Sequence, residues 1–186
     1  MEPAPPRTTE AIVAFLVPPA CREHVVGDLH ERYTTRGQYI AEAVCTIPLV
    51  VASRIRRTTD PQVLLMEAFA LYISFLGVAW KLDGTSFLYE QWGYVRLAIP
   101  AAVALATLKL EDAYANPGKR SPLTPILQST FSFSIVCLFE AALLAIDPRW
   151  AVPLRIMLYG GAIGIVLVST LRMLFPPVDS RPRNAT

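Results

Sequence analysis

Two acidic side chains lie inside long apolar stretches, and they are the residues with the clearest chemical potential. Glu67 is the only formally charged residue in the stretch 62–80, and Glu140 lies in another apolar stretch at 125–146. An unpaired charge in hydrocarbon is costly, so such acids are expected to be paired or functional. On two helices that cross a bilayer, they would be separated by roughly 15 Å along the membrane normal, at 1.5 Å per residue. We therefore do not expect them to form one catalytic pair.

Each acid has basic residues at its own depth. The candidate partners are Lys109 and Arg172 for Glu67, and Arg96 and Arg155 for Glu140. One ion pair in each half of the membrane would hold a helical bundle together. The alternatives are an ion or proton path that uses either acid, and pairing with a charge on another protein.

A second possible site is a short helix in which Cys21, His24 and Asp28 share one face. Divalent metals use these ligand types, but a solvated His24 and Asp28 pair explains the same spacing. The chain contains no glycine-rich phosphate loop, nucleophile elbow or H-E-x-x-H motif. We expect no catalytic residues, no metal and no cofactor.

The composition is that of a membrane protein. Of the 186 residues, 53% are hydrophobic and only 17% are charged, below the roughly 25% usual for soluble domains. The net charge of +2 is too small to indicate a nucleic-acid partner. The cysteines Cys21, Cys45 and Cys137 form neither a disulfide framework nor a zinc pattern. The start of the chain does not resemble a cleaved signal peptide, so we expect it to be retained.

Apolar stretches long enough to cross about 30 Å of hydrocarbon place the acids on transmembrane helices. Four are predicted, at 62–80, 94–110, 125–146 and 154–175. The second is the weakest, because Pro100 interrupts it and Arg96 and Lys109 would have to snorkel to opposite interfaces.

The distribution of basic residues predicts the orientation. Thirteen Lys and Arg lie before the first span, between the second and third, and after the fourth, whereas four lie on the other side. The positive-inside rule therefore places both termini in the cytoplasm. Trp80, Trp92 and Trp150 then all fall at the outer interface, where an aromatic belt is expected.

Small residues indicate where helices can approach closely. Ala98, Ala102 and Ala106 recur every four residues in the second span, and Gly160 with Gly164 forms a G-x-x-x-G in the fourth. Packing inside the bundle is the first interpretation, and an oligomer interface through the two glycines is the second. Polar residues in the first half of the third span, between 128 and 134, could hydrogen-bond across helices.

The segment 1–60 is polar and is predicted to form a cytoplasmic helical module. A helix from about 8 to 17 and another from 20 to 34 should form a hairpin, with Gly37 as the break after it. In the amphipathic helix at 38–57, Ile40 and Val44 belong to the apolar face. This face could lie on the membrane or pack on the hairpin, and both alternatives remain open.

The hairpin carries the run P-P-x-x-R-E-x-x-x-G-D-L-x-E-R-Y from Pro18 to Tyr33. It resembles the N-terminal prefix domain of bacterial permeases of the macrolide-exporter/FtsX type, over about 12–57. The resemblance implies an intracellular hairpin on a bacterial membrane protein, with Gly27 and Asp28 at the turn-facing centre of the motif. It does not imply transport, because the large periplasmic domain of those permeases is missing here. The charged surface implied by the resemblance consists of Arg22, Glu23 and Glu31.

The sequence thus predicts an all-α membrane protein. The cytoplasmic module would be followed by a four-helix transmembrane bundle at 61–176 and a disordered tail at 177–186. We expect a non-enzymatic accessory or interaction protein of the bacterial inner membrane, with the lipid bilayer and another membrane protein or itself as partners. The alternative is a small transporter or channel subunit with Glu67 or Glu140 in a polar path.

Overall fold

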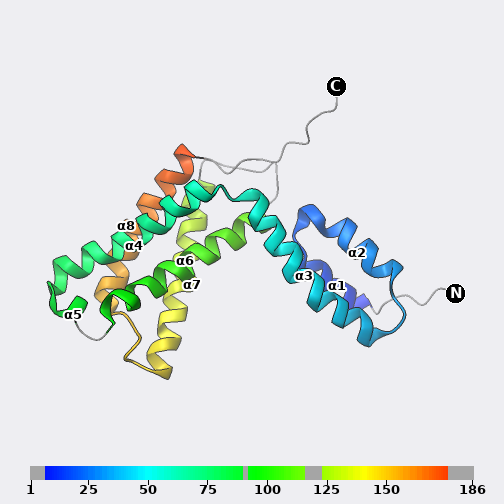
Figure 1. The fold of residues 1–186 in the computed structure, drawn as a ribbon, viewed down its shortest axis with the longest axis horizontal. Coiled ribbons are helices and arrows are strands. Elements are labelled where there is room, and N and C mark those ends of the chain that lie inside the picture. The colour runs from blue at the N-terminus through cyan, green and yellow to red at the C-terminus, as the bar shows by residue number, and fades with distance from the viewer. Residues whose placement is uncertain (1–6, 90–91, 116–122, 176–186) are drawn as a thin grey trace. The chain divides into compact units, whose positions relative to one another are not determined.

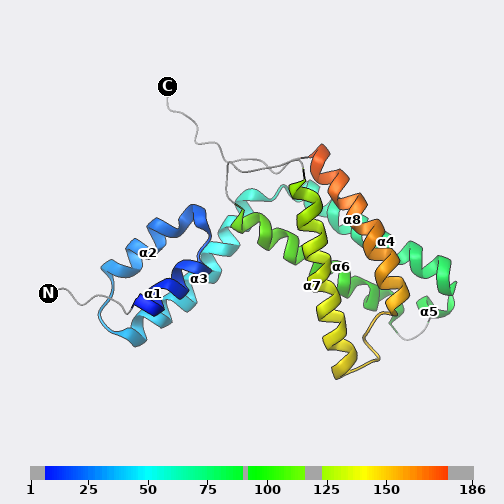
Figure 2. The same ribbon diagram turned by 180° about the vertical axis from the view of Figure 1, so that it is seen from behind.

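The computed structural model describes residues 7–89, 92–115 and 123–175, and every regular element in these ranges is a helix (Figures 1 and 2). The all-α class predicted from the sequence is therefore confirmed for the described residues. The tail predicted to be disordered lies outside them. The elements are α1 (Arg7–Leu16), the short 3-10 helix η1 (Pro19–Cys21), α2 (Arg22–Glu31), α3 (Arg36–Thr58), α4 (Pro61–Asp83), α5 (Ser86–Tyr89), α6 (Gly93–Tyr114), α7 (Thr124–Ile146) and α8 (Leu154–Leu174).

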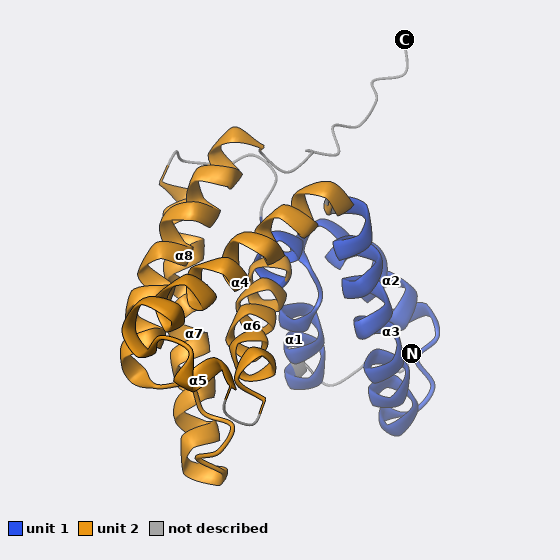
Figure 3. Ribbon diagram, turned by 60° about the vertical axis from the view of Figure 1, so that its left-hand side comes forward, with its two compact units in different colours: residues 1–58, 110–119, 179–186 blue, residues 59–109, 120–178 orange. Residues whose placement is uncertain are grey.

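The helices belong to two compact units, which Figure 3 colours separately. Unit 1 consists of residues 1–58 together with 110–119 and 179–186. Unit 2 consists of residues 59–109 and 120–178. The last turn of α6, which extends beyond the predicted span at 94–110, therefore belongs to unit 1.

Unit 1 is a small three-helix arrangement with its own core. Val13 and Val17 of α1, Leu29 of α2, and Tyr39 and Ala43 of α3 are buried together. Tyr33 packs edge-on against Tyr39, with ring centroids 5.8 Å apart. One face of α3 therefore packs on the α1 and α2 hairpin, which was one of the two alternatives for this helix.

Two details of this region differ from the sequence expectation. Gly37 lies inside α3, because the chain breaks earlier and Thr35 Oγ1 accepts the Gln38 N–H at 3.4 Å at the start of the new helix. Ile40 and Val44 of the expected apolar face are exposed, whereas Ile47 of the same face packs against the unit 1 core beside Tyr39 and Ala43. The sequence could not distinguish the two faces, because apolar residues occupy both.

In unit 2, local signals set the ends of α4. Asp60 Oδ1 accepts the Gln62 N–H at 2.8 Å, and Pro61 occupies the first turn, where its missing N–H has no consequence. At the other end Gly84 adopts a positive φ of 60°, which glycine tolerates more readily than other residues. The helix between them has 23 residues, enough to span about 35 Å.

The most extensive helix packing in unit 2 is between α4 and α8, and glycines on α8 allow it. A Cβ added at Gly160 would lie 2.5 Å from Phe75 Cδ1, and one at Gly164 would lie 3.1 Å from Ser74 Oγ. Both glycines are buried inside the bundle, as the first interpretation of the motif expected. The second interpretation, an oligomer interface through these glycines, conflicts with their burial against α4.

The alanine stripe of α6 lies on an exposed surface, unlike the buried glycines of α8. Ala98, Ala102 and Ala106 are all exposed, contrary to the expectation that they pack inside the bundle. The residues that α6 buries instead are Leu97, Ala101, Ala104 and Leu108. The helix also continues through Pro100, so the proline does not interrupt it. With 22 residues, α6 is long enough to cross a membrane.

Five of the described helices are long and apolar enough to cross a membrane, by length and composition. They are the four predicted spans, now α4, α6, α7 and α8, together with α3. The chain therefore has the character of a multi-pass membrane protein. Of the five helices, α3 is the least apolar, and its charged residues kept it out of the sequence prediction.

The three tryptophans lie at one end of unit 2, because the helices that carry or adjoin them alternate in direction. Trp80 is near the end of α4, Trp92 precedes α6, and Trp150 lies between α7 and α8. Trp92 has a φ of 67°, a strained conformation for an aromatic residue. The next residue, Gly93, would bring an added Cβ within 2.2 Å of the Phe87 carbonyl oxygen. The tight turn therefore requires a glycine at 93.

Candidate functional site

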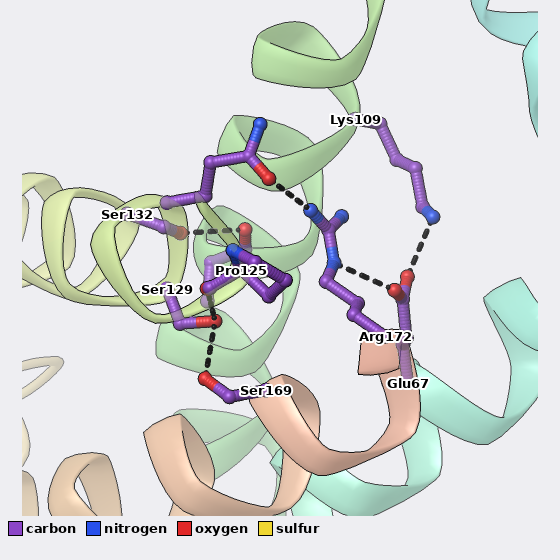
Figure 4. Close-up of polar contacts among 9 residues, drawn as sticks. Glu67, Lys109, Pro125, Ser129, Ser132, Ser169 and Arg172 are labelled. Atoms are coloured by element: carbon purple, nitrogen blue, oxygen red, sulfur yellow. Dashed lines mark hydrogen bonds and ion pairs between the residues drawn. The ribbon is translucent and has the colours of Figure 1, made fainter. Parts of the chain in front are cut away.

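The strongest polar cluster is at the opposite end of unit 2 and centres on Glu67 of α4. Its Oε1 accepts the Nε–H of Arg172 on α8 at 2.9 Å, and its Oε2 lies 2.5 Å from Nζ of Lys109 on α6. Glu67 is 1% exposed, and both cations are also buried. Figure 4 shows the carboxylate between the two basic side chains.

The cluster reaches α7 as well, so it joins all four long helices of unit 2. Arg172 Nη1 donates to Gln128 Oε1 at 3.1 Å. One turn earlier on α8, Ser169 donates to Ser129 Oγ on α7 at 3.2 Å (Figure 4). We call Glu67, Lys109, Gln128 and Arg172 the charge clamp.

The hydroxyl side chains of Ser and Thr in α7 divide between two roles. Ser132 Oγ donates to the Ala104 carbonyl of α6 at 2.9 Å, and Ser129 accepts from α8, so these two bond across helices as expected. Thr130 and Ser134 donate to carbonyls of their own helix instead. Their hydroxyls are therefore satisfied without a partner helix.

The ion pairs of the charge clamp hold the helices together. One carboxylate faces two cations, and each of its oxygens is engaged by one of them. Inside a low-dielectric bundle such contacts are strong, and removal of one member leaves a buried charge uncompensated. A carboxylate held in this way is poorly suited to take up and release a transported ion.

Glu140 of α7 is used differently. Its Oε2 accepts the N–H of Val152 at 3.0 Å, in the connection between α7 and α8. Arg96 of α6 donates through Nη2 to the carbonyl of Ala151 and lies over the Phe87 ring, 4.7 Å from its centroid. The Ala151 carbonyl and the Val152 N–H belong to the same peptide group. Arg96 of α6 and Glu140 of α7 thus bind the carbonyl and the N–H of the same peptide group.

The expected pairing is therefore found for Glu67, whereas Glu140 bonds a backbone N–H and of its two expected partners only Arg96 acts on it electrostatically. Lys109 and Arg172 both contact Glu67, whereas Arg155 is exposed and Glu140 bonds a backbone amide. Neither Arg96 nor Lys109 snorkels outward, because each is turned toward polar groups of unit 2. The backbone of the α7 and α8 connection was not foreseen as a partner, since no sequence pattern reports where a loop folds back.

The sequence analysis also did not predict Ser169 as a residue that hydrogen-bonds between α8 and α7. A signal for it exists, because Ser169 precedes Arg172 by three residues and so shares a helix face with it.

A small pocket lies between the four helices of unit 2, with a volume of about 20 Å³, enough for about one water molecule. Ser129 and Ser132 give it a polar side, and Gly161 and Gly164 open it on the α8 side. Within the part of the chain that is described, the hydroxyls of both serines already make hydrogen bonds. The pocket therefore offers little for recognition of a larger molecule.

The candidate metal site on α2 does not assemble. In residues 7–89, 92–115 and 123–175, no three His, Cys, Asp or Glu side chains gather as ligands of a metal ion would. The histidine that does contact an acid is His30, with Nε2 3.6 Å from Glu10 Oε1.

The motif that resembles a permease prefix spans η1 and α2 and has both exposed and buried members. Arg22, Glu23 and Glu31 are exposed, as expected for its charged surface, and Tyr33 is partly buried against the unit 1 core. Gly27 and Asp28 lie within α2 and are exposed. A Cβ at Gly27 would meet nothing within 4 Å, so no close approach in the described structure explains the glycine.

No family model, curated protein or solved structure matches the chain.

Proposed function

We propose that this protein is a non-enzymatic accessory or interaction subunit of a bacterial inner-membrane complex. In this proposal α4, α6, α7 and α8 cross the bilayer as a rigid anchor, and unit 1 is its cytoplasmic head. The observation that carries it is the charge clamp, because the buried ionisable groups of the clamp bond to other helices of the same chain. Such groups stabilise a scaffold and leave little freedom for transport or catalysis.

The proposed orientation follows from the basic residues. Seven arginines precede α4, and the positive-inside rule favours their side as the cytoplasm. Both termini would then be cytoplasmic. A topology reporter fused after Thr186 tests this orientation, and an extracytoplasmic signal would reject the proposed arrangement of four spans.

The exposed charges of α2 are the proposed contact for a protein partner. Arg22 and Glu23 lie next to each other on a helix whose outer surface is strongly polar. Their exchange, Arg22→Glu with Glu23→Arg, preserves net charge and should leave the core of unit 1 intact. It should reverse the local complementarity to a partner.

The experiment is cross-linking in native membranes, followed by purification in mild detergent and quantification of the proteins bound. We expect a defined partner with the wild type and its loss with the α2 exchange. The matched control is Lys81→Glu with Asp83→Lys, two exposed residues at the end of α4. This role would be refuted if the wild type captured no defined partner. It would also be refuted if the α2 exchange and the control exchange reduced partner binding equally.

The alternative is a small transporter or channel subunit that uses Glu140. It is favoured by one observation, which is that Glu140 Oε1 is buried and has no hydrogen-bond partner among the described residues. Ion or proton flux in vesicles that contain the purified protein, abolished by Glu140→Gln, would support this alternative over the accessory role.

A further inference from the structure

Unit 1 has an uneven surface. Its α2 helix exposes charged residues along most of its length, whereas α1 and α3 expose large apolar side chains. On α1, Phe15 is 77% exposed and Ile12 is 60% exposed, and on α3, Val44 is 65% exposed and Ile40 is 43% exposed. These four side chains form what we call the apolar face. Exposed groups of this kind usually mark an interaction surface.

The four residues point to one side of unit 1. The angles are taken at 100° per residue, with each helix viewed from its N-terminal end. On α1, Ile12 and Phe15 lie on average about 130° anticlockwise of the buried Val13. On α3, Ile40 and Val44 lie on average about 80° clockwise of the buried Ala43. Because α2 runs back between them, α1 and α3 run in the same direction (Figures 1 and 2). Opposite offsets on two parallel helices with a shared core bring both sets to the side away from α2.

The chain keeps the C-terminal end of α3 close to the bilayer. Only Thr59 and Asp60 separate the end of α3 from the start of α4 at Pro61. Three Cα to Cα steps of 3.8 Å span at most about 11 Å. If α4 crosses the membrane, as the proposed function requires, the end of α3 must lie at the membrane surface.

The charge at that end of α3 fits an anionic surface. Arg54, Arg56 and Arg57 lie within its last turn and a half, and the last two are exposed. Arginines near the cytoplasmic leaflet each contribute roughly 1 kcal/mol of attraction to anionic lipids, and exposed apolar side chains of a surface helix insert at the headgroup boundary. We propose that the apolar face of α1 and α3, with these arginines, docks on an anionic lipid bilayer, an inference that rests on the proposed membrane anchor.

Docking on the surface is favoured over crossing for α3. Although its length and composition would permit a span, Tyr39 and Ala43 share a buried core with Leu29 of α2. A membrane-spanning α3 would carry α2 with it, and the charged surface of α2 would enter hydrocarbon. An amphipathic pair that lies on the bilayer keeps α2 in water.

The test uses the full-length protein with Cys21, Cys45 and Cys137 replaced by serine. A single cysteine for an environment-sensitive fluorophore is introduced by Phe15→Cys or Val44→Cys, and by His24→Cys on the exposed side of α2 as the control. The variants are placed in vesicles that contain phosphatidylglycerol and spin-labelled lipids as quenchers. We expect quenching at 15 and 44 to be at least about twofold stronger than at 24, and strongest with the quencher near the headgroup.

The tryptophans provide an internal standard, since all three belong to unit 2. One outcome is that the tryptophans are quenched but the labels at 15 and 44 are quenched no more than the label at 24. This would overturn the lipid-docking proposal while the membrane anchor stands. Unquenched tryptophans would overturn both.

Three further outcomes also decide the matter. A label at 44 quenched best by a deep spin label would place α3 across the bilayer and refute surface docking. Labels at 15 and 44 with blue-shifted emission but no lipid quenching would show that a protein covers the face. In vesicles of zwitterionic lipid alone, quenching at 15 and 44 should weaken, and equal quenching would refute the role of the arginines.

Discussion

Removal of the negative charge from the centre of the clamp should strongly destabilise the bundle. In Glu67→Gln the side chain keeps its length, but one oxygen becomes an NH₂ group that can only donate. In either orientation of the amide, this group faces Lys109 or Arg172, both of which also only donate. The two buried cations also lose their counterion.

The expected magnitude follows from the burial and the two contacts. Loss of one member of a buried ion pair costs about 3–5 kcal/mol in soluble proteins. Polar contacts between membrane helices are worth less, up to about 1.7 kcal/mol each, because the helices of the unfolded state also find partners. For two contacts to a residue that is 1% exposed, we expect a loss of about 3 kcal/mol, on the order of a hundredfold in the unfolding equilibrium.

The assay is equilibrium unfolding in mixed micelles, followed by far-UV circular dichroism and tryptophan fluorescence. The matched control is Asp83→Asn, which also removes one negative charge from α4 but at an exposed position. It should change the free energy of unfolding by no more than about 0.5 kcal/mol. The triple variant Glu67→Met, Lys109→Met and Arg172→Met replaces all the charges with side chains of similar length, so we expect a stability close to that of the wild type.

Two results would refute this reasoning. If Glu67→Gln were no less stable than Asp83→Asn, the clamp would contribute nothing to the bundle. If the triple variant were as unstable as Glu67→Gln, the loss would come from altered shape rather than from uncompensated charge.

Three other perturbations test the packing and the second polar site. Gly160→Ala should lower the free energy of unfolding by about 1–3 kcal/mol, because its Cβ would lie 2.5 Å from Phe75 Cδ1 and 3.2 Å from Phe75 Cα. Ala102→Leu on the exposed side of α6 should change it by less than about 0.5 kcal/mol in detergent, and a larger loss there would show that this side is covered. Glu140→Ala should speed hydrogen exchange at the Val152 amide and lower the free energy of unfolding by about 1–3 kcal/mol. Glu140→Gln keeps a hydrogen-bond acceptor and should have a smaller effect. Equal exchange rates at Val152 in both variants and the wild type would contradict the hydrogen bond.

Much of the fold follows from hydrophobic length. Apolar stretches of about twenty residues can satisfy their backbone in lipid only as helices, so the sequence predicts α4, α6, α7 and α8 to within a few residues at most ends. One boundary that moved is the start of α3. Gly37 was expected as the break before this helix, but α3 already begins at Arg36, and Thr35 Oγ1 accepts the Gln38 N–H.

The two small-residue motifs show the limit of pattern analysis. The G-x-x-x-G of α8 and the alanine stripe of α6 have the same spacing, and either could lie inside or outside a bundle. The structure buries Gly160 and Gly164 against Phe75 and Ser74 and leaves Ala102 exposed. Which face turns inward depends on the bulk of residues on other helices, and no single helix encodes it.

The sequence alone determined that long helices exist and that two acids lie within them, because charge and apolar length are properties of a local stretch. It also indicated that Glu67 has Lys109 and Arg172 at its own depth. Only the tertiary structure decided that both cations meet one carboxylate while Glu140 holds the backbone at Val152. Contacts of this kind join residues up to 105 positions apart, and they depend on how the helices turn about their axes.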